Sequence, residues 1–97
     1  MITYRFEWDD AKALENEGKH GVSFGEAKTV FGDVHALHMY DGEHSWSEDR
    51  FIIIGRSERE RLLYVVYVER SEVTLRLVSA RRATARETRT YEEKASF

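Results

Sequence analysis

Three apolar segments follow one another in the second half of the chain, at residues 50–56, 62–68 and 73–80. The connections between them are charged and short, with five residues at 57–61 and four at 69–72. Strands joined this closely pair in opposite directions, since parallel neighbours need a connection of about a dozen residues or more. The second half is therefore predicted to form an antiparallel meander.

The remaining segments add two strands and three helices to this meander. Alternating aromatic and charged side chains predict a strand at residues 4–8, and a further strand is expected at residues 34–40. Helices are predicted at residues 10–17, 24–31 and 84–95, with Gly21 as a left-handed stop after the first. The other two begin with a capping box, formed by Ser23 with Glu26 and by Thr84 with Glu87.

The predicted element order is β-α-α-β-β-β-β-α within one domain that covers residues 1–97. This order indicates the α+β class, with an antiparallel sheet, N-terminal helices and a C-terminal helix. We expect the helices at both chain ends to cover the same face of the sheet, which gives two layers.

Charge is distributed unevenly along the chain, although the net charge is only −3. Residues 1–49 contain four Lys or Arg against eleven Asp or Glu, a net charge of −7. Residues 50–97 contain eleven Lys or Arg against seven Asp or Glu, a net charge of +4, and ten of those cations are arginine. Arginine suits phosphate recognition, so we expect a focused anion site rather than a generally basic surface.

The chain contains no cysteine, which excludes disulfides, thiolate nucleophiles and cysteine zinc sites. We expect no metal and no other cofactor. The sequence has no apolar run long enough to span a membrane and no apolar signal core near residue 1, so we expect a cytoplasmic protein without a membrane partner.

Several blocks of residues together form a recognisable signature that covers nearly the whole chain: Phe6-Glu7-Trp8-Asp9, Lys19-His20-Gly21-Val22-Ser23-Phe24, Glu48-Asp49-Arg50-Phe51, Ile54-Gly55-Arg56-Ser57 and Ser79-Ala80-Arg81-Arg82-Ala83-Thr84. With these blocks the chain resembles the BrnT family of bacterial type II toxins. Two positions depart from the family pattern, Asp10 where proline is frequent and Gly18 where a better helix former is usual. Both departures concern helix stability rather than chemistry.

The resemblance implies a RelE-like fold and an endoribonuclease that inhibits translation. It also implies a BrnA-type antitoxin that neutralises the toxin, with RNA as substrate and operator DNA contacted only through the antitoxin. The alternative function is a non-catalytic module that binds such a DNA-binding antitoxin and acts as co-repressor.

RNA cleavage without a metal needs a base for the 2′-hydroxyl, cationic donors for the phosphorane and an acid for the 5′-oxygen. His20 is the best acid or base candidate, because histidine ordinarily titrates near neutral pH. Lys19 lies beside it at the end of the first predicted helix. The alternative is that both side chains only cap and neutralise the end of that helix.

Arginines on and after the strands are candidate phosphate ligands. We expect Arg50, Arg76 and Arg81 to join Lys19 and His20 on one catalytic surface. Three further residues are expected to contact RNA: Arg56, Arg82 and the C-terminal aromatic Tyr91. The alternatives are ordinary surface ion pairs for the arginines and packing of the last helix for Tyr91.

Three other features carry less weight. His35 and His38 are three residues apart, so on a strand they point to opposite faces and do not share one metal; a loop in place of the strand is the alternative that would let them. Ser79 has no partners at the spacing of a Ser-His-Asp triad, and we expect it to contribute a hydrogen bond. Trp46 is an aromatic candidate for stacking on RNA, with local packing as its alternative.

Overall fold

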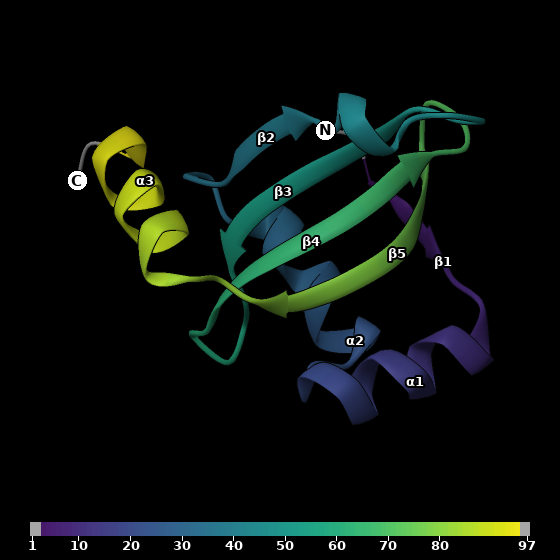
Figure 1. Cartoon of the computed structure of the whole chain (residues 1–97), viewed down its shortest axis with the longest axis horizontal. Helices are drawn as coiled ribbons and strands as arrows, with labels where there is room; N and C mark the ends of the chain where they lie inside the picture. The colour runs from purple at the N-terminus through teal and green to yellow at the C-terminus, as the bar shows by residue number, and fades with distance from the viewer. Residues whose placement is uncertain (1–2, 96–97) are drawn as a thin grey trace.

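The computed structural model describes residues 3–95 and contains one five-stranded sheet in the order β1-β5-β4-β3-β2 (Figure 1). The strands are β1 (Arg5–Glu7), β2 (Leu37–Tyr40), β3 (Arg50–Arg56), β4 (Leu62–Glu69) and β5 (Thr74–Arg82). Strands β2 to β5 are antiparallel neighbours in sequence order, as the short connections predict. The α+β class and the order of the elements are confirmed.

Local signals explain where the helices begin and end. Helix α1 (Asp10–His20) begins after Asp9, whose carboxylate accepts a hydrogen bond from the amide of Lys12, and ends at Gly21 with φ of 68°. Helix α2 (Phe24–Ala27) continues into the 3₁₀ turns of η1 (Lys28–Gly32). Helix α3 (Ala85–Ala95) begins with the complete Thr84–Glu87 capping box. In the part of the chain that the structure describes, no helix is long and apolar enough to cross a membrane.

Strand β1 is the exception to the antiparallel arrangement, because it runs parallel to β5. Its register places Phe6 opposite Leu75, so that Phe6 joins the core below β5. The segment of α1, α2 and η1 returns the chain across the sheet, and β2 then pairs at the opposite edge. A parallel neighbour is possible here because all the elements from α1 to β4 separate β1 from its partner β5.

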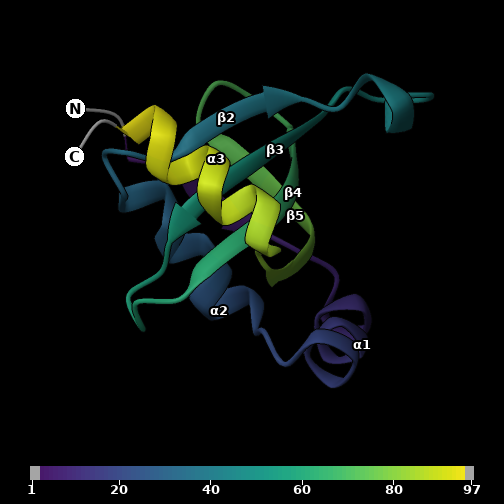
Figure 2. The ribbon, with the colours of Figure 1, turned by 60° about the vertical axis from the view of Figure 1, so that its left-hand side comes forward.

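The helices lie on both faces of the sheet. Helices α1 and α2 and the η1 turns cover one face, which we call the helix face, and its core includes Phe24, Val30, Ile53 and Leu77. Helix α3 covers part of the other face (Figure 2). There Tyr91 packs on Ile52 and Ile54. We had expected the helices to share one face. The adjacent isoleucines of β3 point alternately to the two faces, so each face needs its own cover.

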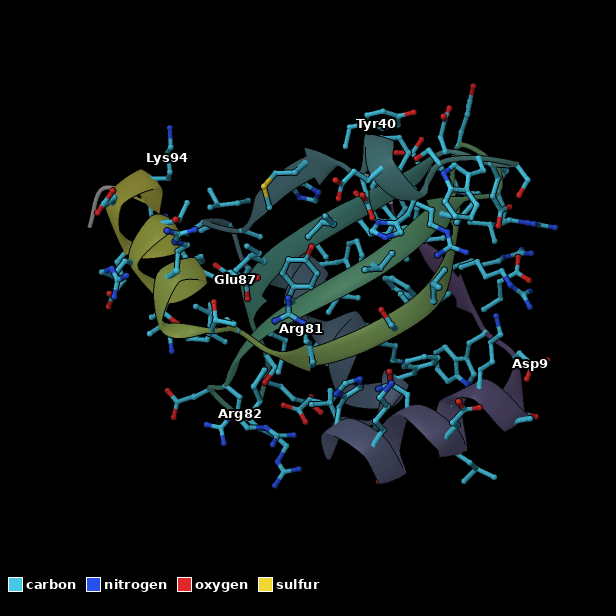
Figure 3. All side chains as sticks on the ribbon, viewed as in Figure 1. Asp9, Tyr40, Arg81, Arg82, Glu87 and Lys94 are labelled. Atoms are coloured by element: carbon cyan, nitrogen blue, oxygen red, sulfur yellow. The ribbon has the colours of Figure 1, made fainter. Side chains whose placement is uncertain are left out.

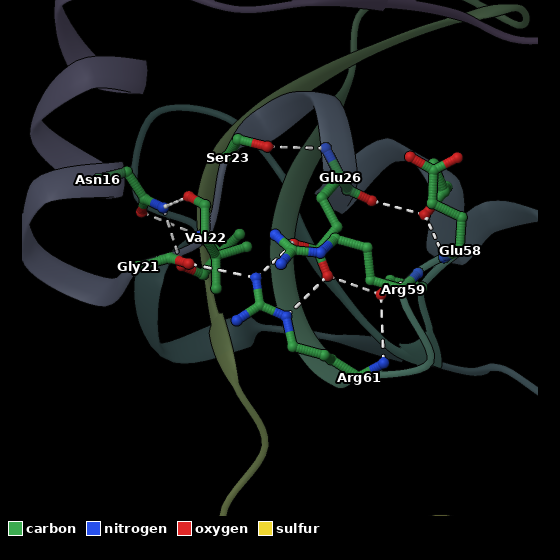
Figure 4. A network of polar contacts seen from close by, with 11 residues as sticks. Asn16, Gly21, Val22, Ser23, Glu26, Glu58, Arg59 and Arg61 are labelled. Atoms are coloured by element: carbon green, nitrogen blue, oxygen red, sulfur yellow. Dashed lines mark hydrogen bonds and ion pairs between the residues drawn. The ribbon is translucent and has the colours of Figure 1, made fainter.

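A buried ion pair connects α2 to the β3–β4 hairpin (Figure 4). The carboxylate of Glu26, 3% exposed, accepts hydrogen bonds from Ser57 Oγ at 2.7 Å and from Arg61 Nε at 3.0 Å. A second nitrogen of Arg61 also contacts Glu26 and donates to the carbonyl of Gly21 at 3.2 Å. Glu26 therefore does not complete the predicted capping box, although its amide donates to Ser23 Oγ at 3.0 Å.

Asn16 joins α1 to the exposed edge of β5. Its side-chain amide, on a residue only 7% exposed, donates to the carbonyl oxygens of Ala80 at 2.9 Å and Val22 at 3.0 Å. Its carbonyl oxygen accepts from the Ala80 amide at 3.1 Å. The side chain thus hydrogen-bonds β5 as a neighbouring strand would, beyond the three residues that β1 covers.

Replacing Asn16 with alanine is expected to lower the free energy of unfolding by about 2–4 kcal/mol, because three backbone groups lose a buried partner. The neighbouring exposed variant Glu17→Ala is the control and should change stability by less than about 0.5 kcal/mol. Urea unfolding at pH 7 measures both values. Equal stability of the two variants would contradict the role assigned to Asn16.

Candidate active site

The face that carries α3 also carries the arginines of the predicted catalytic set, and we call its uncovered part the arginine face. Arg50 and Arg76 lie opposite Val68 on either side of β4. Arg81 lies opposite Tyr64, further along the same face. Directly paired residues of neighbouring strands point to the same face, so these three arginines share one surface. Figure 3 shows Arg81 above this surface, beside Glu87.

Arg81 is held by a carboxylate and an aromatic ring. Its two terminal nitrogens donate to the two oxygens of Glu87 at 2.8 and 2.9 Å. Its guanidinium carbon lies 3.9 Å from the centre of the Tyr64 ring, a cation–π contact. These hydrogen bonds from Arg81 outweigh burial and lower the pKa of Glu87, whereas burial raises the pKa of Tyr64. At neutral pH Glu87 is therefore an anion that positions Arg81, and it is poorly suited to act as a base.

Arg76 and Arg50 differ in their partners. Arg76 forms an ion pair with Glu7 of β1 at 3.1 Å. The side chain of Arg50 has no hydrogen bond or ion pair with any residue in 3–95, although Glu48 and Asp49 precede it. Its guanidinium is available to an anion. Strand β4 lies between Arg50 and Arg76, so the backbones of these two residues are about 10 Å apart.

Lys19 and His20 lie in a shallow hollow of about 220 Å³ between α1 and β5. Val78 and Ser79 form the strand side of this hollow, at the point where the register of β5 shifts against β4. Neither Lys19 nor His20 has a side-chain hydrogen bond or ion pair within the described residues 3–95. Ser79 lies two positions before Arg81, a distance of about 7 Å along a strand. The hollow therefore adjoins the arginine face.

The three residues expected to contact RNA lie in different places. Arg56 lies at the end of β3, with its guanidinium 5.8 Å from the ring centre of Tyr91. Tyr91 is 1% exposed, and its hydroxyl donates to Asp33 at 2.6 Å. A ring buried in this way has no free face for a nucleotide base, so Tyr91 packs α3 onto the sheet. Arg82 is exposed but lies opposite Leu63, on the helix side of β5.

Two residues of the arginine face were missed in the sequence. Glu87 was interpreted only as the capping partner of Thr84, yet it also binds Arg81, six residues earlier. Opposite charges six residues apart on either side of the start of α3 are a sequence signal for this ion pair. Tyr64 becomes part of the site through its register opposite Arg81, which the sequence pattern did not give.

Among residues 3–95, no group of three His, Cys, Asp or Glu side chains is arranged to hold a metal ion. His38 shares a hydrogen bond with the Tyr67 hydroxyl at 3.1 Å, and His44 bonds Asp41 at 3.0 Å. Histidine and lysine of the hollow and the arginines of the strands can supply acid, base and cationic chemistry.

Comparisons with known proteins identify the relatives of this chain. A family model described as "Ribonuclease toxin, BrnT, of type II toxin-antitoxin system" matches residues 8–87. A structural match is the crystal structure of the Brucella abortus ribonuclease toxin BrnT, with a TM-score of 0.65 and 21% sequence identity. The alignment covers 84% of this chain and 99% of that one. The comparison with curated protein sequences gives no match.

Proposed function

Because this chain belongs to the BrnT family of ribonuclease toxins of type II toxin–antitoxin systems, we propose that it cuts RNA internally on the arginine face without a metal ion. The observation that carries this proposal is the hollow in which His20 and Lys19 adjoin Ser79 of β5. That strand also carries Arg76 and Arg81. A proton-transfer group and phosphate ligands thus come from adjoining elements.

The proposed reaction uses the RNA 2′-hydroxyl as the nucleophile. His20 accepts the proton of this hydroxyl while its oxygen attacks the neighbouring phosphorus. The bond from phosphorus to the 5′-oxygen then breaks, and that oxygen takes a proton from Lys19 or from water. The products are a 2′,3′-cyclic phosphate and a 5′-hydroxyl, so atoms and charge balance without another reactant.

Arginine supplies the electrostatic part of the proposed reaction. Arg81 is fixed by Glu87 and Tyr64, and a fixed donor stabilises the charge that develops on the phosphorane without reorganisation. Arg76 keeps one ion pair to Glu7 in the free protein and exchanges it for phosphate when RNA binds. Arg50 has no partner to exchange among residues 3–95, so we assign it to the flanking phosphate.

The proposed biological effect is inhibition of translation, with neutralisation by a BrnA-type antitoxin. An antitoxin belongs to every type II pair, and contact with operator DNA would come only through it. The competing function is a non-catalytic co-repressor module, for which the partly paired arginines Arg76 and Arg81 are the supporting observation.

The decisive experiment incubates the purified full chain, free of other proteins, with a structured RNA in the presence of EDTA. We expect cleavage that leaves 2′,3′-cyclic phosphate ends. His20→Gln is expected to lower the rate about 100-fold or more, as loss of a general acid or base does. Arg76→Ala should also lower the rate, whereas His44→Gln, a histidine in the 41–49 loop, is the matched control.

Absence of cleavage at any protein concentration would favour the co-repressor function. A translation assay with intact ribosomes then separates that outcome from cleavage that needs the ribosome. Cleavage that persists unchanged in His20→Gln would remove His20 from the reaction and leave Lys19 and the arginines as the assigned groups.

A further inference from the structure

A second surface lies on the helix face of the sheet, beside η1. It is a groove of about 430 Å³ that we call the aromatic groove, and its lining includes Tyr4, Phe31, His38, Tyr40, Phe51 and Tyr67. Strand alternation puts this groove on the side of the sheet opposite Arg50, Arg76 and Arg81. The groove is thus separate from the proposed active site.

The rings of the groove form a continuous wall. Phe51 stacks on Tyr67, with ring centres 5.7 Å apart and planes at 28°. Tyr40 approaches Phe51 at 5.6 Å, and Phe31 meets the edge of Tyr67 at 5.0 Å. Tyr40 at the rim is 57% exposed, while Tyr67 at the base is 4% exposed. Burial, together with Glu69 and Tyr4, raises the pKa of Tyr67 to about 12, so its ring stays a neutral phenol.

Two carboxylates lie at this wall, and among residues 3–95 no lysine or arginine lines it. Glu69 is part of the lining, and Asp49 accepts a hydrogen bond from the Tyr40 hydroxyl at 3.0 Å. Neither carboxylate has a cationic partner among residues 3–95. In the hollow next to the groove, Glu48 is paired with Arg70. The rim therefore has a net negative charge.

We propose that the aromatic groove binds an arginine or lysine side chain of a basic segment in a protein partner. A cation placed over aromatic faces is attracted by their quadrupoles, and arginine also stacks on rings. Asp49 and Glu69 supply the opposite charge at the rim. An RNA base would also stack on these rings, but its phosphates would meet the carboxylates, so the charge selects the basic segment.

The opposed positions of the two surfaces have a functional consequence. A partner held in the aromatic groove leaves Arg81 accessible, because the sheet lies between the groove and the arginine face. The hollow that contains His20 shares no lining residue with the groove. The proposal therefore goes beyond the ribonuclease assignment and stands or falls independently of catalysis.

The test titrates the isotopically labelled full chain with a blocked pentapeptide, Gly-Arg-Ile-Arg-Gly, and follows the aromatic NMR signals. The matched ligand carries citrulline in place of both arginines, which keeps the shape and removes the charge. We expect the arginine peptide to shift the signals of Tyr40, Phe51 and Tyr67. The citrulline peptide should bind at least about fivefold more weakly.

Two groove variants and one control locate the binding site. Glu69→Gln and Tyr40→Ala are each expected to weaken the arginine peptide about fivefold, because one removes the rim charge and the other a ring face. Glu92→Gln, which removes an exposed charge of α3, should leave the affinity unchanged. If Tyr40→Ala does not fold, the affinity of Glu69→Gln still tests the proposal. Glu69 is exposed at the end of β4, so its replacement is expected to leave the fold intact.

Several results would overturn the proposal. These are equal binding of the citrulline peptide, unchanged affinity of Glu69→Gln, or absence of shifts at the groove rings at millimolar peptide. A single-stranded RNA that shifts the same rings would indicate a nucleic-acid surface instead. Self-association of the chain that Tyr40→Ala abolishes would show that a second copy occupies the groove.

Discussion

Replacing Arg81 with alanine is expected to lower the rate of RNA cleavage by about 100-fold to 1,000-fold, the usual cost of removing a preorganised donor to a developing oxyanion. Arg81 is the most fixed cation of the arginine face, with two hydrogen bonds to Glu87 and the Tyr64 ring below it. The measurement is the single-turnover rate on a short RNA in EDTA.

Arg82→Ala is the matched control for this experiment. The two arginines are adjacent in β5, but Arg82 points to the other side of the strand (Figure 3). We expect Arg82→Ala to stay within about threefold of the wild-type rate, as for the loss of one exposed charge. Equal losses in the two variants would mean that positive charge, rather than the geometry of the arginine face, supports the activity.

Arg81→Lys separates geometry from charge further. Lysine keeps the charge but does not present the planar pair of donors that Glu87 holds. We expect the lysine variant to retain less than about a tenth of the activity. Thermal unfolding of each variant must accompany the rates, because loss of the Glu87 contacts also lowers stability by about 1–2 kcal/mol.

Replacing Arg61 with alanine is expected to lower the free energy of unfolding by about 3–5 kcal/mol at pH 7. The variant leaves the carboxylate of Glu26 buried with only Ser57 and the more distant Arg59. Small domains have a total stability of about 5–15 kcal/mol, so this loss is a large fraction of it. Urea unfolding measures the difference.

Arg59→Ala is the control for Arg61→Ala. Arg59 approaches the same carboxylate oxygen at 3.7 Å, but its side chain is 67% exposed. We expect its removal to cost less than about 1 kcal/mol, as is typical of exposed ion pairs. If both variants lose the same free energy of unfolding, the burial of Arg61 does not add to the stability of the fold.

The pH dependence gives a second readout of the Glu26–Arg61 pair. The hydrogen bond from Arg61 lowers the pKa of Glu26 below 4.5 despite burial. This lowered pKa stabilises the wild-type fold above pH 4.5, and the stabilisation is lost as the pH falls through the folded-state pKa. In Arg61→Ala, burial without that partner raises the pKa of Glu26. Protonation of Glu26 at lower pH therefore increases the stability of this variant. The difference between the two proteins should therefore shrink between pH 7 and pH 4.

Much of the local structure could be predicted from the sequence. Residues 50–56 are a strand with those bounds, and the Thr84–Glu87 capping box is complete in the structure. Gly21 ends α1 with a positive φ, as predicted. These features depend on residues within one turn or one strand, where side-chain pattern and backbone preference act directly.

The prediction that the C-terminal helix shares a sheet face with the other helices was wrong, and the sequence already contained the reason. The run from Phe51 to Ile54 is apolar without alternation, which is typical of a strand buried on both faces. A helix was therefore required on each side of β3. Tyr91 meets that requirement on one side with Ala95, and Val30 of η1 does so on the other.

Part of the candidate site depends on contacts between distant segments. Arg76 pairs with Glu7, 69 positions away, because β1 is parallel to β5. His20 lies beside β5 because α1 packs at this edge of the sheet, where Asn16 hydrogen-bonds Ala80. Neither contact follows from a local pattern, since a helix or strand signal does not specify its partner.

The sequence by itself determined where the strands and helices form, to within a few residues, and it offered the arginines of β3 and β5 as candidate phosphate ligands. Strict alternation along β5 would put Arg76 and Arg81 on opposite faces, and only the register shift of β5 against β4 brings them to the same one. Only the tertiary structure decided that His20 lies beside this surface, that Tyr91 is buried and that the aromatic groove opens on the other side. The physical reason is that backbone periodicity is a local property, whereas the neighbours of each face are chosen by packing across the whole chain.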